Sequence, residues 1–307
     1  MNMLQKIISE KDLAWDKHSG NTIENFSVQI SDNASNELRD NHQLITNLEE
    51  TFPILQKEIL GFKNKFLIGG IGFFVIDGKC FSDFSREETI GIYNKICKAL
   101  GTLYVQNIKN EKFVVIKDEG KSMMSGGRYH QTKEGGSFHT DSPQWNKVPD
   151  FVGLCCVNPA KKGGESKFVS AYSVHNEILK EHKHFLKILY DQFHFDKRGE
   201  YRSDESPTVF EPIFTYDNNH LKLRYLRDYI NDGHKIQNMP LSKEQNGALD
   251  CLDKIIHDEN LAVSYELKQG DMIFLNNGRV LHGRTAFEDF EDIDKKRQMI
   301  RTWIKDI

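Results

Sequence analysis

The chain has 307 residues, of which 38% are hydrophobic, so it is long enough to bury a large core in one domain or in two smaller ones. Its 41 Lys and Arg and 45 Asp and Glu residues are mixed in sign along the sequence and give a net charge of −4, which excludes the basic patch of a nucleic-acid-binding protein. The first residues include acidic side chains and no long apolar block, so we expect neither a signal peptide nor a membrane span.

The cysteines indicate a reducing environment. There are five of them and none belongs to a Cys-x-x-Cys pair, so reduced thiols fit better than a disulfide framework. We therefore expect a cytoplasmic protein whose partner is a small-molecule substrate, with no nucleic-acid and no membrane partner. The sequence leaves the oligomeric state open.

The N-terminal part differs in composition from the rest. Residues 1–42 are polar, rich in Asn, Ser and Asp, and weakly periodic, which predicts a loosely packed extension ahead of a single domain over residues 43–307. Apolar residues at helical spacing then predict a helix over residues 44–60, divided by Pro53.

Next, residues 66–76 form two short apolar runs around glycines and predict two strands. Residues 85–100 predict a helix, because Ser85 and Glu88 have the spacing of a capping box and apolar residues follow at helical spacing.

Residues 123–136 are rich in Gly and polar residues and predict a loop. Arg128 and Tyr129 lie in it, just before the candidate metal ligands described below. Loops that border a site commonly carry substrate contacts, so both are candidate substrate-binding residues. A solvated connection is the alternative interpretation.

The remainder alternates between strand-like runs and turns. Strands are expected at residues 151–157, 167–169, 209–216, 220–225, 261–266, 272–275 and 279–282. Helices are expected at residues 173–190 and 241–257, and His175, His182 and His184 in the first of them are expected to be exposed. Strands separated by tight turns predict a mainly β fold of antiparallel sheets with helices packed outside.

Two candidate metal ligands occur together in this pattern. His139 and Asp141 are two residues apart, after a glycine pair and before Pro143. In an extended chain their side chains point to the same face. The best candidate for a third ligand is His282. Two His and one carboxylate leave open positions on a metal, as in non-haem Fe(II) oxygenases.

A second His-x-Asp pattern, His194 and Asp196, lacks these surroundings. It follows an apolar run that looks helical, and no glycine turn precedes it. We interpret it as a structural or surface pair.

Arg297 and Arg301 add a second chemical signal. In an extended strand they face the same side, and on a strand beside His282 they would point into the cavity that holds the metal. A buried guanidinium without a partner is costly, so such an arginine needs an anion, and a carboxylate satisfies it.

Together these residues resemble the TauD/TfdA family of Fe(II)/2-oxoglutarate-dependent dioxygenases, which includes taurine dioxygenase and clavaminate synthase. The similarity covers about residues 65–307. The segments that carry it are 138–141, 163–166, 270–271, 281–287 and the pair Arg297 and Arg301.

The resemblance implies a double-stranded β-helix, or clavaminate synthase-like jelly roll, with His139, Asp141 and His282 as the Fe(II) ligands. It implies that Arg297 pairs with the distal carboxylate of 2-oxoglutarate, helped by the hydroxyl of Ser166. Fe(II), 2-oxoglutarate and O₂ are then the expected cofactor and co-substrates.

Arg301 matches a family position nearer the substrate, and an exchange of roles between it and Arg297 stays open. The implied reaction oxidises a C–H bond by hydroxylation, desaturation or oxidative cyclisation and releases succinate and CO₂. Arg128, Arg224, Arg227 and Arg301 are candidates for a cationic pocket that accepts a carboxylate-bearing or amino-acid-like metabolite. Pairing with surface acids is the alternative for these arginines.

Two other functions use parts of the same pattern. A zinc-dependent hydrolase also uses two His and one Asp, but it has no evident use for Arg297 and Ser166. A metal-free jelly-roll binding protein is the second alternative. A JmjC-type protein hydroxylase would share the three ligands, but the paired arginines fit the small-molecule group better.

Overall fold

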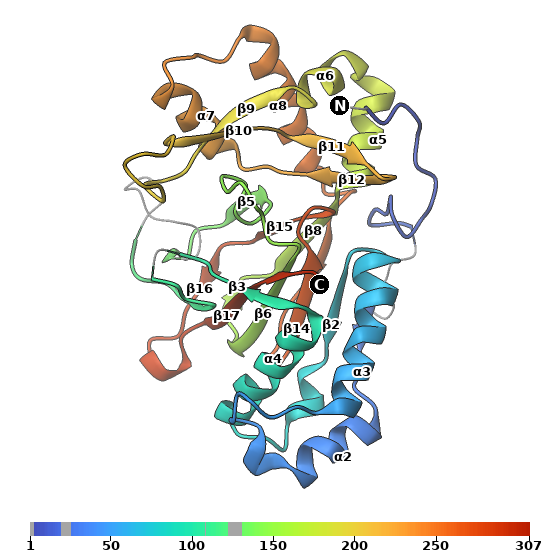
Figure 1. Cartoon of the computed structure of the whole chain (residues 1–307), viewed down its shortest axis with the longest axis vertical. Helices are drawn as coiled ribbons and strands as arrows, with labels where there is room; N and C mark the ends of the chain where they lie inside the picture. Colours follow the sequence, from blue (N-terminus) through green and yellow to red (C-terminus); the bar gives the residue numbers. More distant parts are fainter. Residues whose placement is uncertain (1–2, 20–25, 108, 122–130) are drawn as a thin grey trace.

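The computed structural model describes residues 3–19, 26–107, 109–121 and 131–307 (Figure 1). Its described strands form two main sheets, with helices outside them. This arrangement agrees with the predicted jelly roll.

The larger sheet has seven strands. Across the sheet they are β1 (Ser27–Val28), β2 (Phe73–Ile76), β14 (Met272–Asn276), β6 (Phe151–Asn158), β17 (Gln298–Lys305) and β3 (Thr102–Tyr104), with β4 (Phe113–Ile116) also paired to β17. The β1–β2 pair is parallel and the other pairs are antiparallel.

The smaller sheet has four strands, all antiparallel. Its order is β13 (Val263–Tyr265), β8 (Ser166–Ser170), β15 (Val280–Arg284) and β5 (Gly136–His139). Three further two-stranded pairs join β9 (Gln192–Asp196) to β10 (Thr208–Pro212), β11 (Phe214–Asp217) to β12 (His220–Leu223), and β7 (Lys162–Gly163) to β16 (Phe287–Glu288).

A core lies between the two main sheets. Phe73 of the larger sheet stacks on Phe168 of the smaller one, with ring centroids 4.8 Å apart. Alternate residues of β2 point the other way, so Phe74 packs instead with the helices on the outer face. The sheets are thus held together by the inward half of each strand.

Three helices cover the outer face of the larger sheet: α2 (Asp32–Asp40), α3 (Pro53–Phe62) and α4 (Arg86–Leu100). The predicted capping box of α4 is present, because Ser85 and Glu88 each accept a hydrogen bond from the other's backbone. Of the helix predicted over residues 44–60, the part from Pro53 onward forms α3, where the missing N–H of Pro53 is not needed. Residues 45–52 form turns and irregular chain, so the first half of that prediction is wrong.

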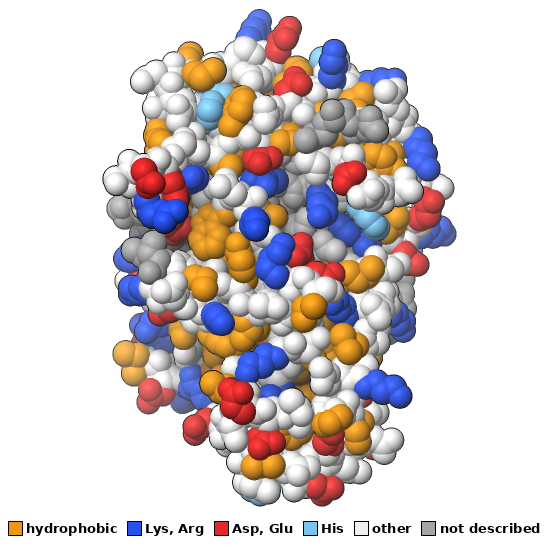
Figure 2. All heavy atoms as spheres, in the orientation of Figure 1, with side chains coloured by type: hydrophobic (Ala, Val, Ile, Leu, Met, Phe, Trp, Pro, Cys, Tyr) orange, Lys and Arg blue, Asp and Glu red, His pale blue; other side chains and the backbone are white. Residues whose placement is uncertain are grey.

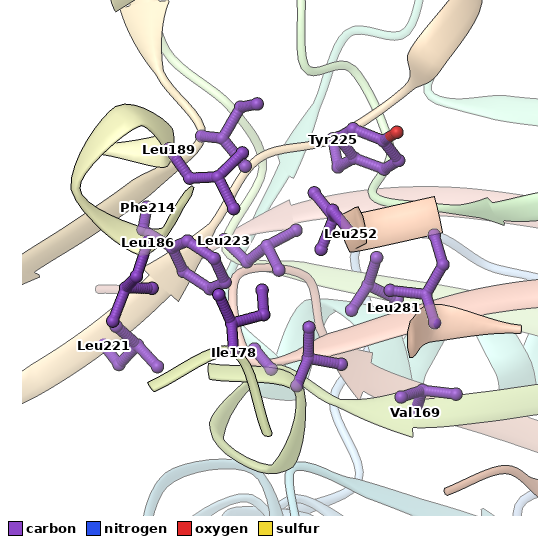
Figure 3. Packing of buried hydrophobic residues seen from close by; sticks show 14 of the residues in the cluster. Val169, Ile178, Leu186, Leu189, Phe214, Leu221, Leu223, Tyr225, Leu252 and Leu281 are labelled. Atoms are coloured by element: carbon purple, nitrogen blue, oxygen red, sulfur yellow. The ribbon is translucent and has the colours of Figure 1, made fainter. Parts of the chain in front are cut away.

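Four helices lie beyond the smaller sheet: α5 (Ala171–Glu181), α6 (Lys183–Leu189), α7 (Arg227–Ile236) and α8 (Lys243–Ile256). Figure 3 shows their common core, in which Ile178, Leu189 and Leu252 gather beside Val169 and Leu281 of the smaller sheet. This second core supports the strands that carry the site.

The loose packing expected of residues 1–42 is wrong for the described part of that segment. Leu4, Ile8 and Trp15 are buried, and β1 extends the larger sheet. Asn176 of α5 donates to the backbone oxygen of Ile8 and accepts from its N–H. Buried apolar residues this far apart leave no periodic signal in a polar sequence.

Two other expectations also need correction. The first apolar run of 66–76 belongs to a π-helix (Lys63–Ile68), and β2 alone is a strand. The helix over 173–190 is interrupted at His182. His175 is not exposed but fully buried, because it lies on the inner side of α5 and its Nε2 pairs with the hydroxyl of Tyr190 at 3.0 Å.

None of the helices in the described part of the chain combines the length and the apolar character needed to cross a bilayer. Figure 2 shows acidic and basic side chains intermingled over one face of the molecule, as the mixed charge pattern of the sequence predicted.

Candidate active site

The three candidate metal ligands meet at the end of β5. His139 and His282 are direct cross-strand partners of β5 and β15, and their ring centroids are 4.5 Å apart. Oδ1 of Asp141 lies 3.8 Å from Nε2 of His139 and 3.9 Å from Nε2 of His282. One donor atom from each residue lies within 4.8 Å of the others. The sequence-predicted trio is therefore brought together.

The local backbone differs from the extended run that we expected. β5 ends at His139, and Ser142 has a φ of 56°, in the left-handed region that non-glycine residues rarely adopt. Asp141 is held in this bend by Asn277, which accepts from its N–H at 2.7 Å and donates to its carbonyl oxygen at 2.9 Å. A strained bend persists when such contacts determine it.

Asn277 was not singled out from the sequence, where the stretch 276–278 indicated only a turn. Its side chain is buried, and it also donates to the carbonyl oxygen of Pro149. An Asn in a turn gives no indication that its side chain binds the backbone of Asp141, because Asp141 is 136 residues away in sequence.

The two oxygens of Asp141 receive hydrogen bonds from β17. Nε1 of Trp303 donates to Oδ2 at 2.7 Å, and Nη1 of Arg301 donates to Oδ1 at 3.3 Å. Burial alone would raise the pKa of Asp141, but the charge of Arg301, the two imidazoles and the indole N–H together lower it to about 2. The carboxyl group is ionised at neutral pH.

Both imidazoles are neutral. Burial lowers the pKa of His139, and burial with the neighbouring His139 lowers the pKa of His282 to about 3. Nδ1 of His139 donates to the backbone oxygen of Ser137 at 2.9 Å, which places the ring's lone pair on Nε2, the nitrogen that faces Asp141. Two neutral imidazoles and one carboxylate match the donor set of a 2-His-1-carboxylate iron site, so Fe(II) fits these residues.

The trio lies in a cavity that extends along β17. Arg297, Met299, Arg301 and Trp303 line it in alternation, as the strand period predicted for Arg297 and Arg301. Arg297 is 5% exposed, and its Nη1 has no hydrogen-bond partner among the described residues. A guanidinium in this state lacks the anion that it needs.

Ser166 lies at the same end of the cavity as Arg297. It is buried in β8 and lines the cavity. Gly164 is close by, because a side chain there would come within 3.4 Å of Nε of Arg297. Both predicted co-substrate residues thus reach the cavity.

Arg301 has a different environment from the one that we expected. It lines the cavity, but Nε donates to Oε1 of Gln106 at 2.8 Å and Nη1 contacts Asp141. Gln106 is buried and is another residue that the sequence did not indicate.

Two of the predicted substrate arginines do not line the cavity. Nη1 of Arg224 donates to the backbone oxygens of Pro143 and Trp145, both at 3.0 Å, and so fastens the bend after Asp141. Arg227 pairs with Asp253 and Asp250 of α8, each at 2.8 Å. These contacts agree with the alternative interpretation of pairing with other groups of the protein and give no support to a role of Arg224 or Arg227 in a cationic pocket.

Arg128 and Tyr129 lie outside the described residues. The second His-x-Asp pattern is a structural pair, as interpreted. Nδ1 of His194 lies 3.1 Å from the hydroxyl of Thr208, and Asp196 accepts from the N–H of Arg198.

A family model agrees with this geometry. The model described as "Taurine catabolism dioxygenase TauD, TfdA family" matches residues 67–303. FR-33289 synthase of Streptomyces rubellomurinus is 31% identical over 240 residues, which cover 76% of this chain and 69% of that protein. Human gamma-butyrobetaine dioxygenase is 26% identical over 164 residues, or 52% of this chain and 42% of that protein.

Solved structures share the fold. Asparagine oxygenase in complex with Fe(II), 2S,3S-3-hydroxyasparagine and succinate superposes with a TM-score of 0.70 at 15% identity, over 91% of this chain and 93% of that one. The non-heme iron oxygenase OrfP, in complex with Fe, succinate and (3S)-hydroxy-L-Arg, gives a TM-score of 0.65 at 12% identity, over 91% and 94%. The predicted double-stranded β-helix is confirmed.

Proposed function

The chain belongs to the TauD/TfdA family of non-haem Fe(II)- and 2-oxoglutarate-dependent dioxygenases, and from this we propose that it oxidises a C–H bond of a small, carboxylate-bearing, amino-acid-like metabolite. Hydroxylation, desaturation and oxidative cyclisation are the possible outcomes. The zinc hydrolase and the metal-free binding protein are set aside, because the family is one of dioxygenases.

In this proposal His139, Asp141 and His282 hold Fe(II). The observation that carries it is a single cavity that contains these three donors within 4.8 Å of one another and a buried arginine without an anion. When bound, Fe(II) with 2-oxoglutarate and O₂ supplies an oxidant for an unactivated C–H bond, and 2-oxoglutarate leaves as succinate and CO₂.

The protein's own groups position the reactants. Arg297 and the hydroxyl of Ser166 orient the distal carboxylate of 2-oxoglutarate. Trp303 fixes the rotation of the Asp141 carboxylate through its hydrogen bond. Apolar cavity residues such as Met299 exclude water from the reacting carbon.

The charge of the cavity supports an anionic substrate. Among the described residues that line it, the charged side chains are three arginines, at 284, 297 and 301, and two carboxylates, Asp141 and Glu200, so 3 − 2 gives these residues a net charge of +1 with neutral imidazoles. Fe(II) and the dianion of 2-oxoglutarate cancel each other. The remaining positive charge favours a substrate carboxylate, and Arg301 stands beside the proposed metal ligand.

The amino-acid-like part of the proposal has support from the structural relatives. The complexes of asparagine oxygenase and OrfP contain hydroxylated amino acids. At 12 to 15% identity these likenesses establish the fold alone, so the substrate needs a direct test.

The test is a screen of L-amino acids and related carboxylates for substrate-stimulated succinate release by the Fe(II)-loaded protein. We expect at least one carboxylate to stimulate release, and mass spectrometry of its product distinguishes the gain of an oxygen from the loss of two hydrogens. Stimulation by neutral compounds alone would contradict the proposed substrate class.

A further inference from the structure

We propose that Arg284 is a second co-substrate-binding residue, so that the distal carboxylate of 2-oxoglutarate lies between the guanidinium groups of Arg284 and Arg297. This inference rests on the proposed function in one respect, namely that Arg297 binds that carboxylate. Neither the sequence pattern nor the family resemblance singled out Arg284 for this role.

The position of Arg284 on its strand suits the role. It lies two residues after His282 on β15, and both side chains line the cavity. Residues two apart on a strand are separated by roughly 7 Å and face the same side. Arg284 is also the cross-strand partner of Ser166 on β8. A dicarboxylate that extends from the metal ligands along β15 therefore arrives at Arg284 and Ser166 together.

Arg284 and Arg297 share one aromatic ring. Their guanidinium carbons lie 4.6 Å and 5.1 Å from the centroid of Phe287. Arg284 ends β15, Arg297 directly precedes β17, and Phe287 of β16 contacts both, so the two cations lie at the same end of the cavity.

Neither cation forms an ion pair with a carboxylate in the part of the chain that the structure describes. Nη2 of Arg284 donates to the backbone oxygens of Thr132 and Glu134. Asp289 accepts from the main-chain N–H of Arg297, but Nη1 of Arg297 stays without a partner.

Two like charges against one ring are unfavourable when neither is in an ion pair, and here Arg297 is buried and Arg284 is half-buried. Both guanidinium groups carry a full positive charge, because arginine stays protonated in proteins. One carboxylate has two oxygens and accepts from two guanidinium groups at once. Binding of the distal carboxylate would reduce the repulsion between the two arginines and accept hydrogen bonds from both. A site made of Arg297 and Ser166 alone would leave the charge of Arg284 without an anion.

Another buried arginine shows what a purely structural role looks like. Arg279 also lies over an aromatic ring, that of Tyr172, but its two terminal nitrogens donate to three backbone oxygens, those of Leu67, Ile68 and Gly70. It does not line the cavity. Arg284 uses one terminal nitrogen in this way and presents its charge to the cavity.

The test measures 2-oxoglutarate binding to the Mn(II)-loaded protein by calorimetry, beside the steady-state KM and kcat of the Fe(II) enzyme. Arg284→Met should raise the Kd and the KM for 2-oxoglutarate about 10- to 100-fold, since a hydrogen bond to a charged group is lost, with a far smaller change in kcat. The Kd for Mn(II) should be unchanged.

Arg227→Met is the control. That arginine pairs with Asp250 and Asp253 of α8 and lies outside the cavity lining, so the Kd of this variant for 2-oxoglutarate should stay within about twofold of the wild type. Arg284→Lys keeps the positive charge and replaces Arg284→Met in the experiment if the Met variant does not fold. It should weaken 2-oxoglutarate binding severalfold and leave binding of 2-oxobutyrate, which has no distal carboxylate, unchanged.

Three results separate the possible failures. If Arg284→Met binds 2-oxoglutarate like the wild type while Arg297→Ala does not, this inference is overturned and the proposed function stands. If Arg284→Met loses Mn(II) affinity as well, Arg284 acts by supporting the loop before β5, and the inference is again overturned. If Arg297→Ala also binds 2-oxoglutarate normally, the proposed placement of the co-substrate fails.

Discussion

Replacing Trp303 with Phe should weaken metal binding without removing a ligand. The indole N–H donates to Oδ2 of Asp141 at 2.7 Å, and both side chains are 4% exposed. A hydrogen bond to a buried charged group contributes about 1.5–3 kcal/mol. Loss of a residue that hydrogen-bonds to a metal ligand lowers metal affinity about 10- to 100-fold, or about 1.4–2.7 kcal/mol, a range that overlaps that contribution. We therefore expect the Kd for Mn(II) to rise by this factor.

The assay follows the electron paramagnetic resonance signal of free Mn(II), which falls as the ion binds and needs no turnover. Trp145→Phe is the matched control, because it makes the same ring exchange but removes a hydrogen bond to Glu200 at 2.9 Å. Trp145 and Trp303 pack edge to face, with centroids 5.4 Å apart, so both variants disturb the same ring contact. Wild-type affinity in a folded Trp303→Phe protein would refute the reasoning, and equal weakening in both variants would assign the effect to packing.

Three further predictions follow from the site and the core. His139→Ala or His282→Ala should abolish substrate-stimulated succinate release, because each removes a proposed ligand; full turnover in either would refute the ligand assignment. Arg297→Ala should mainly raise the KM for 2-oxoglutarate, by about 10-fold or more, and an unchanged KM in steady-state kinetics would remove its proposed role. Burial lowers the pKa of His175 from 6.5 to about 4, so the unfolded chain takes up the proton first and stability is lost as the pH falls from 6.5 to 4, by about 3 kcal/mol. Urea unfolding at about pH 7 and pH 4.5 should show a smaller loss for His175→Gln, and an equal loss would contradict this origin.

Most of the predicted residues that the structure brings into the cavity are recognisable from the spacing of residues close together in the sequence. His139 and Asp141 are two residues apart, and Arg297, just before β17, and Arg301 within it are four apart, so local spacing already predicts which side chains face one cavity. The pairing of His282 with His139 is different in kind. It follows from strand order in the smaller sheet, which local spacing does not encode. The sequence alone therefore offered His282 only as the best candidate for a third ligand, and the family resemblance implied its role.

The differences from the sequence-based expectations have physical reasons of two kinds. Arg224 and Arg227 have the right residue type for a cationic pocket, but type does not reveal that backbone oxygens and Asp253 already accept their hydrogen bonds. Leu4 and Trp15 are isolated apolar residues in a polar segment. They are buried because they pack against hydrophobic clusters formed by distant parts of the chain. In both cases the deciding partner is remote in sequence.

The strand that carries His139 has a consequence for metal loading. β5 is one of the two edge strands in the described part of the smaller sheet, and it pairs with β15 in a register that shifts between His282 and Arg284. Because neighbouring side chains alternate in direction, a slip of β5 by one residue would turn the imidazole of His139 to the opposite face. A slip of β5 would therefore remove the proposed ligand His139 from the ion, and amide exchange along β5 should slow when the ion is present.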